Sequence, residues 1–257
     1  MRIATYNVNG INGRLPVLLA WLEATSPDVV CLQELKAPDE KFPEAAIAKA
    51  GYGAVWHGQK SWNGVAILAR GADPTETRRG LPGEPGDDHS RYIEAAVGGI
   101  LVACLYVPNG NPRPGPKFDY KLRWLQRLHD HSKELIATDA PVVLAGDYNI
   151  IPTPKDAYKP ERWTEDALFF QPVRDAYQSL LDMGWTDALR ATYPDETIYT
   201  FWDYFRRAFD RDAGLRIDHL LLNAKADKRL KSAGVDRSVR AMEKTSDHAP
   251  VWIELSA

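Results

Sequence analysis

The feature that most constrains the fold of this chain is a series of short apolar runs, rich in Val, Ile and Leu, that recurs along its whole length. Runs of roughly four to eight residues between turn residues predict β-strands. Nine such runs occupy residues 2–8, 28–34, 53–57, 64–69, 91–97, 100–107, 141–149, 215–222 and 249–255. Helical spacing of apolar residues occurs in three longer segments, 15–25, 117–137 and 172–183. The sequence therefore predicts at least nine strands and a smaller number of helices.

Turn residues show how neighbouring runs connect. Asn63-Gly64 joins the runs at 54–59 and 63–70, and Gly98-Gly99 joins those at 91–97 and 100–107. Such dipeptides favour hairpins, so the chain is not a succession of strict βαβ units, and its helices exclude an all-β fold. We therefore predict one α/β domain over residues 1–257, in which two mixed β-sheets pack face to face and are flanked by helices.

Composition narrows the class of protein. With 257 residues, 44% hydrophobic and 26% charged, the chain is an ordinary globular protein rather than a disordered, collagen-like or disulfide-rich one. The net charge of −3 gives no global positive field for nucleic acid. Cys31 and Cys104 lie in apolar runs, which favours buried free thiols and a reducing compartment. No run approaches membrane length and the N-terminus has no basic-then-apolar signal region, so we expect a cytoplasmic, soluble protein with no membrane partner. No sequence feature demands more than a monomer, so we expect a monomer.

Polar side chains stand where several apolar runs end. They are Asn7, Glu34, Tyr106, Asp147, Asn149 and Asp218, with Asp247 and His248 directly before the last run. Taken alone, Asn7 fits a turn and His248 fits a structural role, whereas Asp218 lies among apolar neighbours and is costly to bury without a partner. As a set, they predict a ligand site at one edge of the sheets.

The residue types in this set indicate the chemistry. Carboxylates and amides are hard oxygen ligands that select Mg²⁺ or Mn²⁺. Zinc has little support, because HExxH is absent and His129 and His131 fall on different faces of a predicted helix. GxSxG, a P-loop and GxGxxG are absent as well. A metal-assisted hydrolysis of a phosphate ester, with a carboxylate that aligns water and a His–Asp pair beside the phosphate, fits best.

The motifs that contain these residues resemble a known family. In chain order they are NVNGI, LQELK, NGVAIL, LYVPNG, GDYNIIP, YTFWDY, GLRIDHLL and EKTSDHAPVW, from residue 7 to 252. Together they are similar to the exonuclease III family of abasic-site endonucleases, within the endonuclease/exonuclease/phosphatase superfamily. The resemblance covers essentially the whole chain and implies a four-layer α/β sandwich with its site at one end of the two sheets.

The resemblance also implies a role for each matched residue. Asn7 and Glu34 match metal-site residues and Asp247 matches a further acidic residue there, with Mg²⁺ as the cofactor and Mn²⁺ as a substitute. The other matched residues surround the reacting phosphate. Asp147 matches the residue that orients or deprotonates the attacking water, and Asn149, His248 and Tyr106 match residues that contact the phosphate. Asp218 matches the residue that holds the histidine, and Asn109 lies in the same loop as Tyr106. Whether Tyr106 or Asp147 acts first, and whether one metal or two is used, stay open.

Three residues match a small apolar pocket for a flipped-out baseless sugar in the repair branch of the family. They are Phe201, Leu215 and Ile217, where Leu215 replaces the large aromatic of some relatives, and plain core packing is the alternative. Basic and aromatic neighbours are candidates for gripping DNA phosphates: Arg91, Arg113, Arg206, Arg207, Arg211, Arg216 and Trp202.

The resemblance thus implies a Mg²⁺-dependent DNA-repair phosphodiesterase. Its expected partner is double-stranded DNA with abasic sites or 3′ ends, which it incises 5′ to the abasic site, digests from 3′ to 5′, or trims at 3′ ends. One alternative keeps the catalytic site and changes the substrate to a phosphoester outside DNA. The other is a non-catalytic DNA-binding protein, which would require lost site residues, and none of the nine matched positions is lost.

Overall fold

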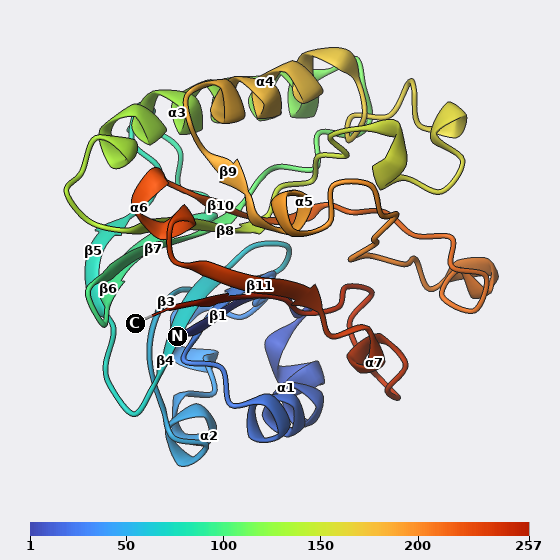
Figure 1. The fold of residues 1–257 in the computed structure, drawn as a ribbon. Coiled ribbons are helices and arrows are strands. Elements are labelled where there is room, and N and C mark those ends of the chain that lie inside the picture. The colour runs from blue at the N-terminus through green and yellow to red at the C-terminus, as the bar shows by residue number, and fades with distance from the viewer. Residues whose placement is uncertain (257) are drawn as a thin grey trace.

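Two six-stranded β-sheets lie face to face at the centre of the computed structural model, which describes residues 1–256 (Figure 1). The first sheet has the order β11 (Leu230–Val235), β12 (Val251–Leu255), β1 (Arg2–Asn7), β2 (Val29–Gln33), β4 (Val65–Arg70) and β3 (Tyr52–His57). The second has the order β5 (Thr75–Arg79), β6 (Tyr92–Val97), β7 (Ile100–Tyr106), β8 (Val142–Asp147), β10 (Asp218–Leu222) and β9 (Thr186–Asp187). Both sheets are mixed, because β1 and β2 run parallel, as do β7 and β8, while the other pairs are antiparallel.

Helices cover the two outer faces, which confirms the four-layer arrangement. On the first sheet, α1 (Ile11–Thr25) packs through Trp21 against Tyr6 of β1, with ring centroids 5.8 Å apart, and α2 (Glu44–Lys49) lies on the same side. On the second sheet, α3 (Pro116–Ile136) and α4 (Gln171–Asp182) pack against outward-facing residues such as Leu144 of β8. The remaining short helices are α5 (Ala188–Thr192), α6 (Ala224–Asp227) and α7 (Arg237–Arg240).

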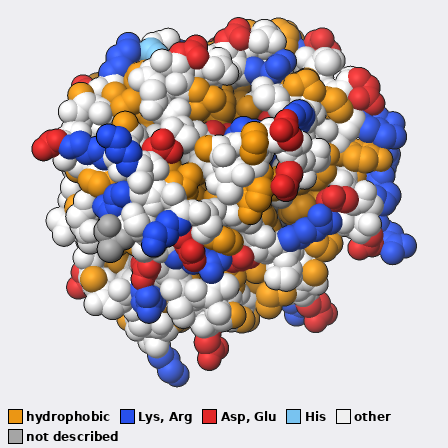
Figure 2. All heavy atoms as spheres, in the orientation of Figure 1, with side chains coloured by type: hydrophobic (Ala, Val, Ile, Leu, Met, Phe, Trp, Pro, Cys, Tyr) orange, Lys and Arg blue, Asp and Glu red, His pale blue; other side chains and the backbone are white. Residues whose placement is uncertain are grey.

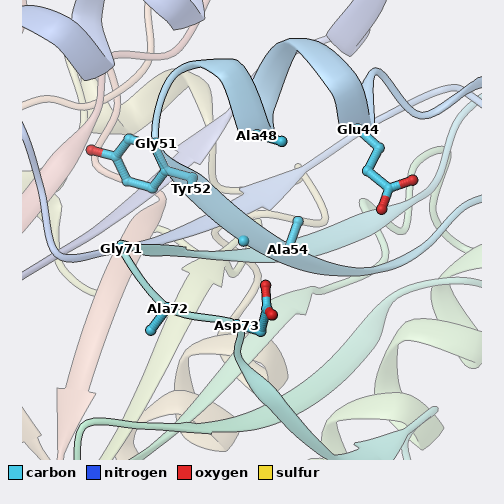
Figure 3. Close-up of a pocket in the computed structure, with 9 residues that line it drawn as sticks. Glu44, Ala48, Gly51, Tyr52, Ala54, Gly71, Ala72 and Asp73 are labelled. Carbon is cyan, nitrogen blue, oxygen red and sulfur yellow. The ribbon is translucent and has the colours of Figure 1, made fainter.

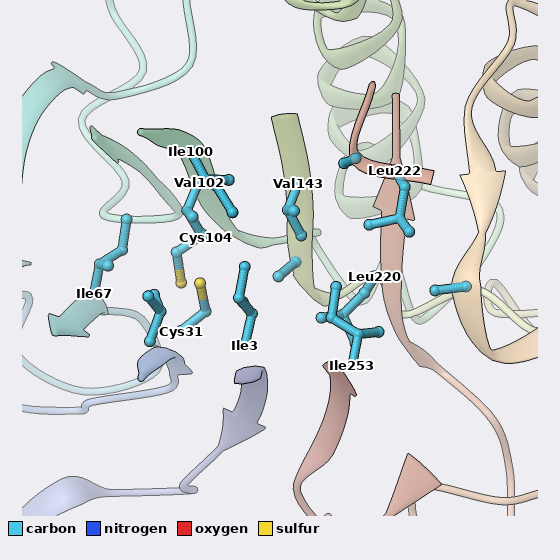
Figure 4. Packing of buried hydrophobic residues seen from close by; sticks show 14 of the residues in the cluster. Ile3, Cys31, Ile67, Ile100, Val102, Cys104, Val143, Leu220, Leu222 and Ile253 are labelled. Atoms are coloured by element: carbon cyan, nitrogen blue, oxygen red, sulfur yellow. The ribbon is translucent and has the colours of Figure 1, made fainter. Parts of the chain in front are cut away.

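The main core fills the space between the sheets (Figure 4). Side chains alternate along each strand, so Ile3 points into this core while Ala4 packs under the helices. Cys31 and Cys104 come from opposite sheets, and both are free and buried, as predicted. Among residues 1–256, no helix is both long and apolar enough to cross a membrane.

All nine expected strands are present, and three others were not predicted. Strand β5 is an exposed edge strand with the polar sequence TETRR, β9 has only two residues, and β11 has few apolar residues. The run at 215–222 also forms a shorter strand than expected, because β10 begins at Asp218. Leu215, before it, makes isolated bridges to Ala157 and Phe201 instead.

Candidate active site

The ends of the central strands meet at one edge, as the sequence predicts. Asn7 ends β1, Tyr106 ends β7 and Asp147 ends β8, while Asp218 begins β10 directly opposite Asp147. Because β10 runs antiparallel to β8, its first residue reaches the edge at which β8 ends. A pocket at this edge is lined by Glu34, Tyr106, Asn109, Asn111, Asp147, Asn149, Trp163, Asp166, Leu168, Phe201, Asp203, Leu215, Ile217, Asp247 and His248.

A separate pocket lies beside α2 and the turn after β4 (Figure 3). It shares no residue with the strand-end pocket. Its lining consists of Glu44, Ala48, Gly51, Tyr52, Gly53, Ala54, Gly71, Ala72 and Asp73. The candidate active site is therefore placed at the strand ends, where the polar residues of both sheets converge.

A buried ion pair joins His248 to Asp218. The Nδ1 atom of His248 lies 2.9 Å from Oδ2 and 3.1 Å from Oδ1 of Asp218, and the Thr200 hydroxyl donates to Oδ2 at 2.6 Å. Burial alone would lower the pKa of His248, but the charge and hydrogen bond of Asp218 outweigh it and raise the pKa to about 10. The imidazole is therefore a cation at neutral pH, with its Nε2 atom 3.8 Å from Asp147.

Asp147 is a buried carboxylate with an unusual affinity for protons. Its Oδ2 accepts a hydrogen bond from Asn7 Nδ2 at 2.9 Å, and its Oδ1 accepts one from the Asn149 backbone at 2.9 Å. Burial raises its pKa to about 7, against the opposing effect of the His248 charge. A carboxylate that exchanges a proton near neutral pH is suited to general base catalysis.

Ligand atoms of Asp147, Asp218 and His248 lie within 4.8 Å of one another. Metal coordination needs a neutral imidazole, whereas His248 is held as a cation by Asp218. This trio is therefore better suited to handling a proton and a phosphate charge than to holding an ion.

Glu34 and Asp247 present carboxylates to the same pocket. Glu34 Oε1 accepts from Asn7 Nδ2 and from the Tyr106 hydroxyl, both at 2.9 Å, and Oε2 lies 2.8 Å from Lys36 Nζ. Burial would raise the pKa of Glu34, but the Lys36 charge and these donors lower it. Glu34 is thus ionised, and its carboxylate and that of Asp247 supply oxygens that suit a hard divalent cation, whereas Asn7 faces Glu34 and Asp147 through its amide nitrogen.

Tyr106 is held as a hydrogen-bond donor. Burial, with the neighbouring Glu34 carboxylate, raises the pKa of its hydroxyl well above the usual value. The Arg91 guanidinium stacks 4.7 Å from the ring centroid, and one of its nitrogens donates to the Tyr106 carbonyl at 3.3 Å. Arg91 Nε is buried and has no hydrogen-bond partner within the described residues, while the side chain as a whole is partly exposed next to Tyr106.

The amides of Asn109 and Asn149 are linked to each other. Asn109 Nδ2 donates to Asn149 Oδ1 at 3.2 Å, and Asn149 Nδ2 donates to the Val107 carbonyl at 2.9 Å. Asn149 also adopts a left-handed backbone with φ of 49°, a conformation that non-glycine residues rarely take and that concentrates at functional sites. The structure therefore brings both predicted asparagines to the pocket wall.

Phe201, Leu215 and Ile217 line one side of the pocket, as the sequence predicts. Phe201 stands edge-on to the His248 ring, with centroids 5.0 Å apart. Leu168 and Trp163 complete this apolar side, and Asn111 and Asp166 add polar atoms next to it. These four residues and Asp203, which also lines the pocket, were missed, because they lie in Pro-rich or irregular segments without periodicity. Only the Pro-rich loops themselves indicated a surface role.

Two predicted DNA contacts are wrong. Arg216 is 1% exposed, and its guanidinium is bound to Asp156 at 2.6 Å and to Asp187 at 2.7 Å. Trp202 is also 1% exposed, with its indole donating to Asp212. Both side chains are buried and bonded to carboxylates, so neither presents a surface to a phosphate.

Other basic candidates differ in their surroundings. Arg113 stacks 3.4 Å from the Phe170 ring centroid and binds Glu165 at 2.8 Å, so it is already engaged. Arg206, Arg207 and Arg211 are exposed. Lys and Arg side chains gather along the right-hand edge of the view in Figure 2, where the segment of residues 205–207 lies in Figure 1.

Comparisons with known proteins agree with this geometry. Exodeoxyribonuclease III of Haemophilus influenzae is 35% identical, over 99% of both chains. Among solved structures, a 3′-5′ exonuclease (NExo) from Neisseria meningitidis is similar with a TM-score of 0.97 and 42% identity, covering 100% of both chains. An AP endonuclease from Archaeoglobus fulgidus is similar with a TM-score of 0.95 and 37% identity, again over 100% of both chains.

A family model matches nearly the whole chain as well. The match runs over residues 4–248 and so includes the metal-type carboxylates Glu34 and Asp247 together with the Asp218–His248 ion pair. The chain belongs to the Endonuclease/Exonuclease/phosphatase family.

Proposed function

We propose that this protein is a Mg²⁺-dependent DNA-repair phosphodiesterase, which incises DNA 5′ to abasic sites, acts as a 3′-to-5′ exonuclease, or trims 3′ ends. The observation that carries the proposal is the buried His248–Asp218 pair beside Asp147, at a pocket that also presents Glu34 and Asp247. This arrangement combines a cationic donor, a base with a pKa near neutrality and carboxylate oxygens for an ion in one pocket.

Glu34, Asp247 and Asn7 are the residues proposed to hold the metal ion. Their oxygens suit a hard divalent cation. When bound, the ion would supply positive charge next to the phosphate and the departing oxygen.

Asp147 is proposed to orient the attacking water and take its proton. His248, kept cationic by Asp218, donates to a phosphoryl oxygen that gains charge in the transition state. Asn149 and Asn109 are proposed to place their amide groups beside the same phosphoryl oxygens. The hydrogen bond from the Tyr106 hydroxyl to Glu34 orients that hydroxyl toward the same site.

DNA as the substrate is supported by the relatives. The Haemophilus protein is an exodeoxyribonuclease, and a 3′ phosphatase NExo from Neisseria has been solved with a product DNA hairpin. In this chain, the apolar wall of Phe201, Leu215 and Ile217 is proposed to receive a baseless sugar or a 3′ end. Arg91 and the exposed Arg206 and Arg207 are proposed to contact phosphates on either side.

We further propose that residues 1–257 act as one domain and as a monomer, because the site takes residues from both sheets of a single chain. The free thiols of Cys31 and Cys104 suit the reducing cytoplasm.

The test is cleavage of a labelled duplex with one central abasic analogue, beside an undamaged duplex with a recessed 3′ end. Each is incubated with Mg²⁺, with Mn²⁺ and with EDTA. We expect metal-dependent cleavage of at least one substrate, and the ratio of the two rates identifies the dominant activity. If the folded protein binds Mg²⁺ but cleaves neither duplex, the proposal is wrong and a phosphoester outside DNA becomes the better candidate.

A further inference from the structure

A fully buried lysine lies directly behind the catalytic pocket and takes no part in the proposed chemistry. Lys121 belongs to α3 and is 0% exposed. Its Nζ atom donates to three backbone carbonyls, those of Asn109 at 3.1 Å, Asn149 at 2.6 Å and Ala167 at 3.0 Å. An ammonium has three N–H groups, so all of its donors are used.

The three carbonyls come from three different segments of the pocket wall. Asn109 follows β7, Asn149 follows β8, and Ala167 precedes α4. Asn109 and Asn149 themselves line the pocket, and Leu168, next to Ala167, forms part of its apolar side. One side chain, anchored in a long helix, therefore binds the three segments that carry these groups.

The charge of Lys121 matters for this arrangement. Three carbonyl dipoles converge on Nζ, and a neutral amine, with two N–H groups, would leave one buried carbonyl without its donor. Burial lowers the pKa of Lys121 to about 7, while the nearby carboxylates of Asp147 and Asp166 favour the charged form. The ammonium is thus costly to bury and is held by the groups around it.

The loop after β7 is shaped to fit the lysine stem. Gly110 has φ of +88°, and a Cβ atom there would stand 2.6 Å from Lys121 Cδ. Asn111 then connects this loop to the third segment, since its amide donates to Asp166 at 3.0 Å and accepts from the Ala167 backbone at 3.1 Å. The loop is therefore packed on Lys121 as well as hydrogen-bonded to it.

We infer that Lys121 is a positioning residue, whose ammonium holds the backbones of Asn109, Asn149 and Ala167 so that the pocket wall keeps the geometry needed at the reacting phosphate. The inference rests on the proposed function, because that function assigns Asn109 and Asn149 to the phosphate. Lys121 itself touches neither the pocket nor the substrate; it acts through the loops.

The test compares Lys121→Met, which keeps the length of the stem and removes the charge, with Lys121→Gln, which keeps a polar end. Lys117→Met is the matched control, because Lys117 is exposed on the same helix. For each variant, kcat and KM are measured on the recessed 3′ duplex, and backbone hydrogen exchange is followed at residues 108–111, 149–151 and 166–168. Thermal unfolding monitors the fold.

We expect Lys117→Met to match the wild type. Lys121→Met should lower kcat by at least about ten-fold with little change in KM, since misplaced groups weaken the transition state more than the bound substrate. Lys121→Gln should recover part of the loss, and both variants should show faster exchange in all three segments. If a folded Lys121→Gln or Lys121→Met keeps wild-type kcat and wild-type exchange, the inference is wrong.

The two proposals fail differently. A wild-type protein that cleaves no DNA contradicts the proposed function, whereas the exchange comparison still tests whether Lys121 holds the three segments. If Lys121→Met does not fold, the same comparison is made with Lys121→Gln. Equal losses of kcat and of substrate affinity in that variant would contradict a positioning role.

Discussion

Asp218 Oδ2 lies 2.9 Å from Nδ1 of His248, and the Thr200 hydroxyl donates to the same oxygen at 2.6 Å. This contact fixes the ring so that Nε2 faces the pocket, 3.8 Å from Asp147. A histidine in such a site is both oriented and charged, because the carboxylate binds the nitrogen on the side away from the substrate. The pair thereby links β10 to the segment before β12 across the two sheets.

Asp218→Asn should shift the alkaline limb of the pH–rate profile downward. His248 acts as a cation, and its pKa of about 10 keeps it charged through neutral pH in the wild type. Without the Asp218 charge, the proton is lost at a lower pH, by roughly 1–3 units, so activity falls most at pH 8–9 and least near pH 6. Measurement of kcat against pH checks this, with the exposed Asp182→Asn as control. An alkaline limb that stays in place contradicts the assignment.

Asp147→Asn should lower kcat by roughly 10²–10⁴ while leaving the fold intact, since an amide cannot take a proton from water. In the wild type, activity should rise with pH as the Asp147 carboxyl, whose pKa is about 7, loses its proton. Single-turnover cleavage measures the rate, and calorimetry checks that Mg²⁺ affinity is nearly unchanged. Near-normal turnover would show that another group orients the water.

Glu34→Gln should raise the Mg²⁺ concentration needed for half-maximal activity, because a neutral amide is a weaker ligand for a hard cation. The amide retains acceptor capacity for Asn7 and Tyr106, which now bond to the carboxylate at 2.9 Å. Activity at saturating Mg²⁺ should therefore recover in part. The rate is titrated with Mg²⁺, and Asp247→Asn, titrated in parallel, should shift in the same direction. A half-saturation point equal to the wild type in both variants would remove these residues from the metal site.

Arg206→Ala/Arg207→Ala should weaken DNA binding and flatten its dependence on salt. Both residues are exposed in the segment after Trp202, and each phosphate contact that is lost removes nearly one unit from the slope of log K against log salt. Binding of an uncleaved duplex is measured by fluorescence anisotropy between low and moderate salt. The exposed Lys133→Ala, in α3, is the control. An unchanged slope would exclude this segment from the DNA footprint.

The strand-end residues could be predicted from the sequence because a polar residue directly after an apolar run is a local pattern. Asn7 and Asp147 are 140 positions apart, yet both follow apolar runs, and the fold brings the amide and the carboxylate within 2.9 Å. The same reasoning placed Glu34, Tyr106 and Asp218 at one edge. The apolar residues of a strand and the polar residue that follows them are neighbours in the sequence, so both can be recognised without knowledge of the fold.

Residues whose roles depend on distant partners could not be predicted. Lys121 lies within a charged, amphipathic helix, where a lysine normally faces water, and nothing local indicates that three carbonyls meet there. Leu168 and Trp163 lie in irregular segments, so only the folded chain reveals that they line the pocket. Arg216 alternates with apolar neighbours and matches a surface cation in the sequence, but its partners come from two distant segments, Asp156 from the loop after β8 and Asp187 from β9.

Arg216→Met supplies a test of that correction. Removal of the guanidinium leaves the buried carboxylates of Asp156 and Asp187 without their main partner, which should cost about 3–5 kcal/mol of the free energy of unfolding at pH 7. Burial favours the neutral form of Asp187, but Arg216 outweighs it and lowers the pKa to about 2. In the wild type, the ionised Asp187 therefore adds to the free energy of unfolding above its ordinary pKa of 3.8, and this contribution is lost as the pH falls through about 2.

The variant should show the opposite dependence on pH. With Arg216 removed, burial raises the pKa of Asp187 above its ordinary value, so protonation relieves the buried charge and the variant gains stability as the pH falls toward that value. Urea unfolding of both proteins at several pH values checks the sign, and Asp187→Asn added to Arg216→Met should restore part of the loss. The salt slope of DNA binding should match the wild type. A flatter slope with normal stability would instead return Arg216 to the DNA-contacting surface.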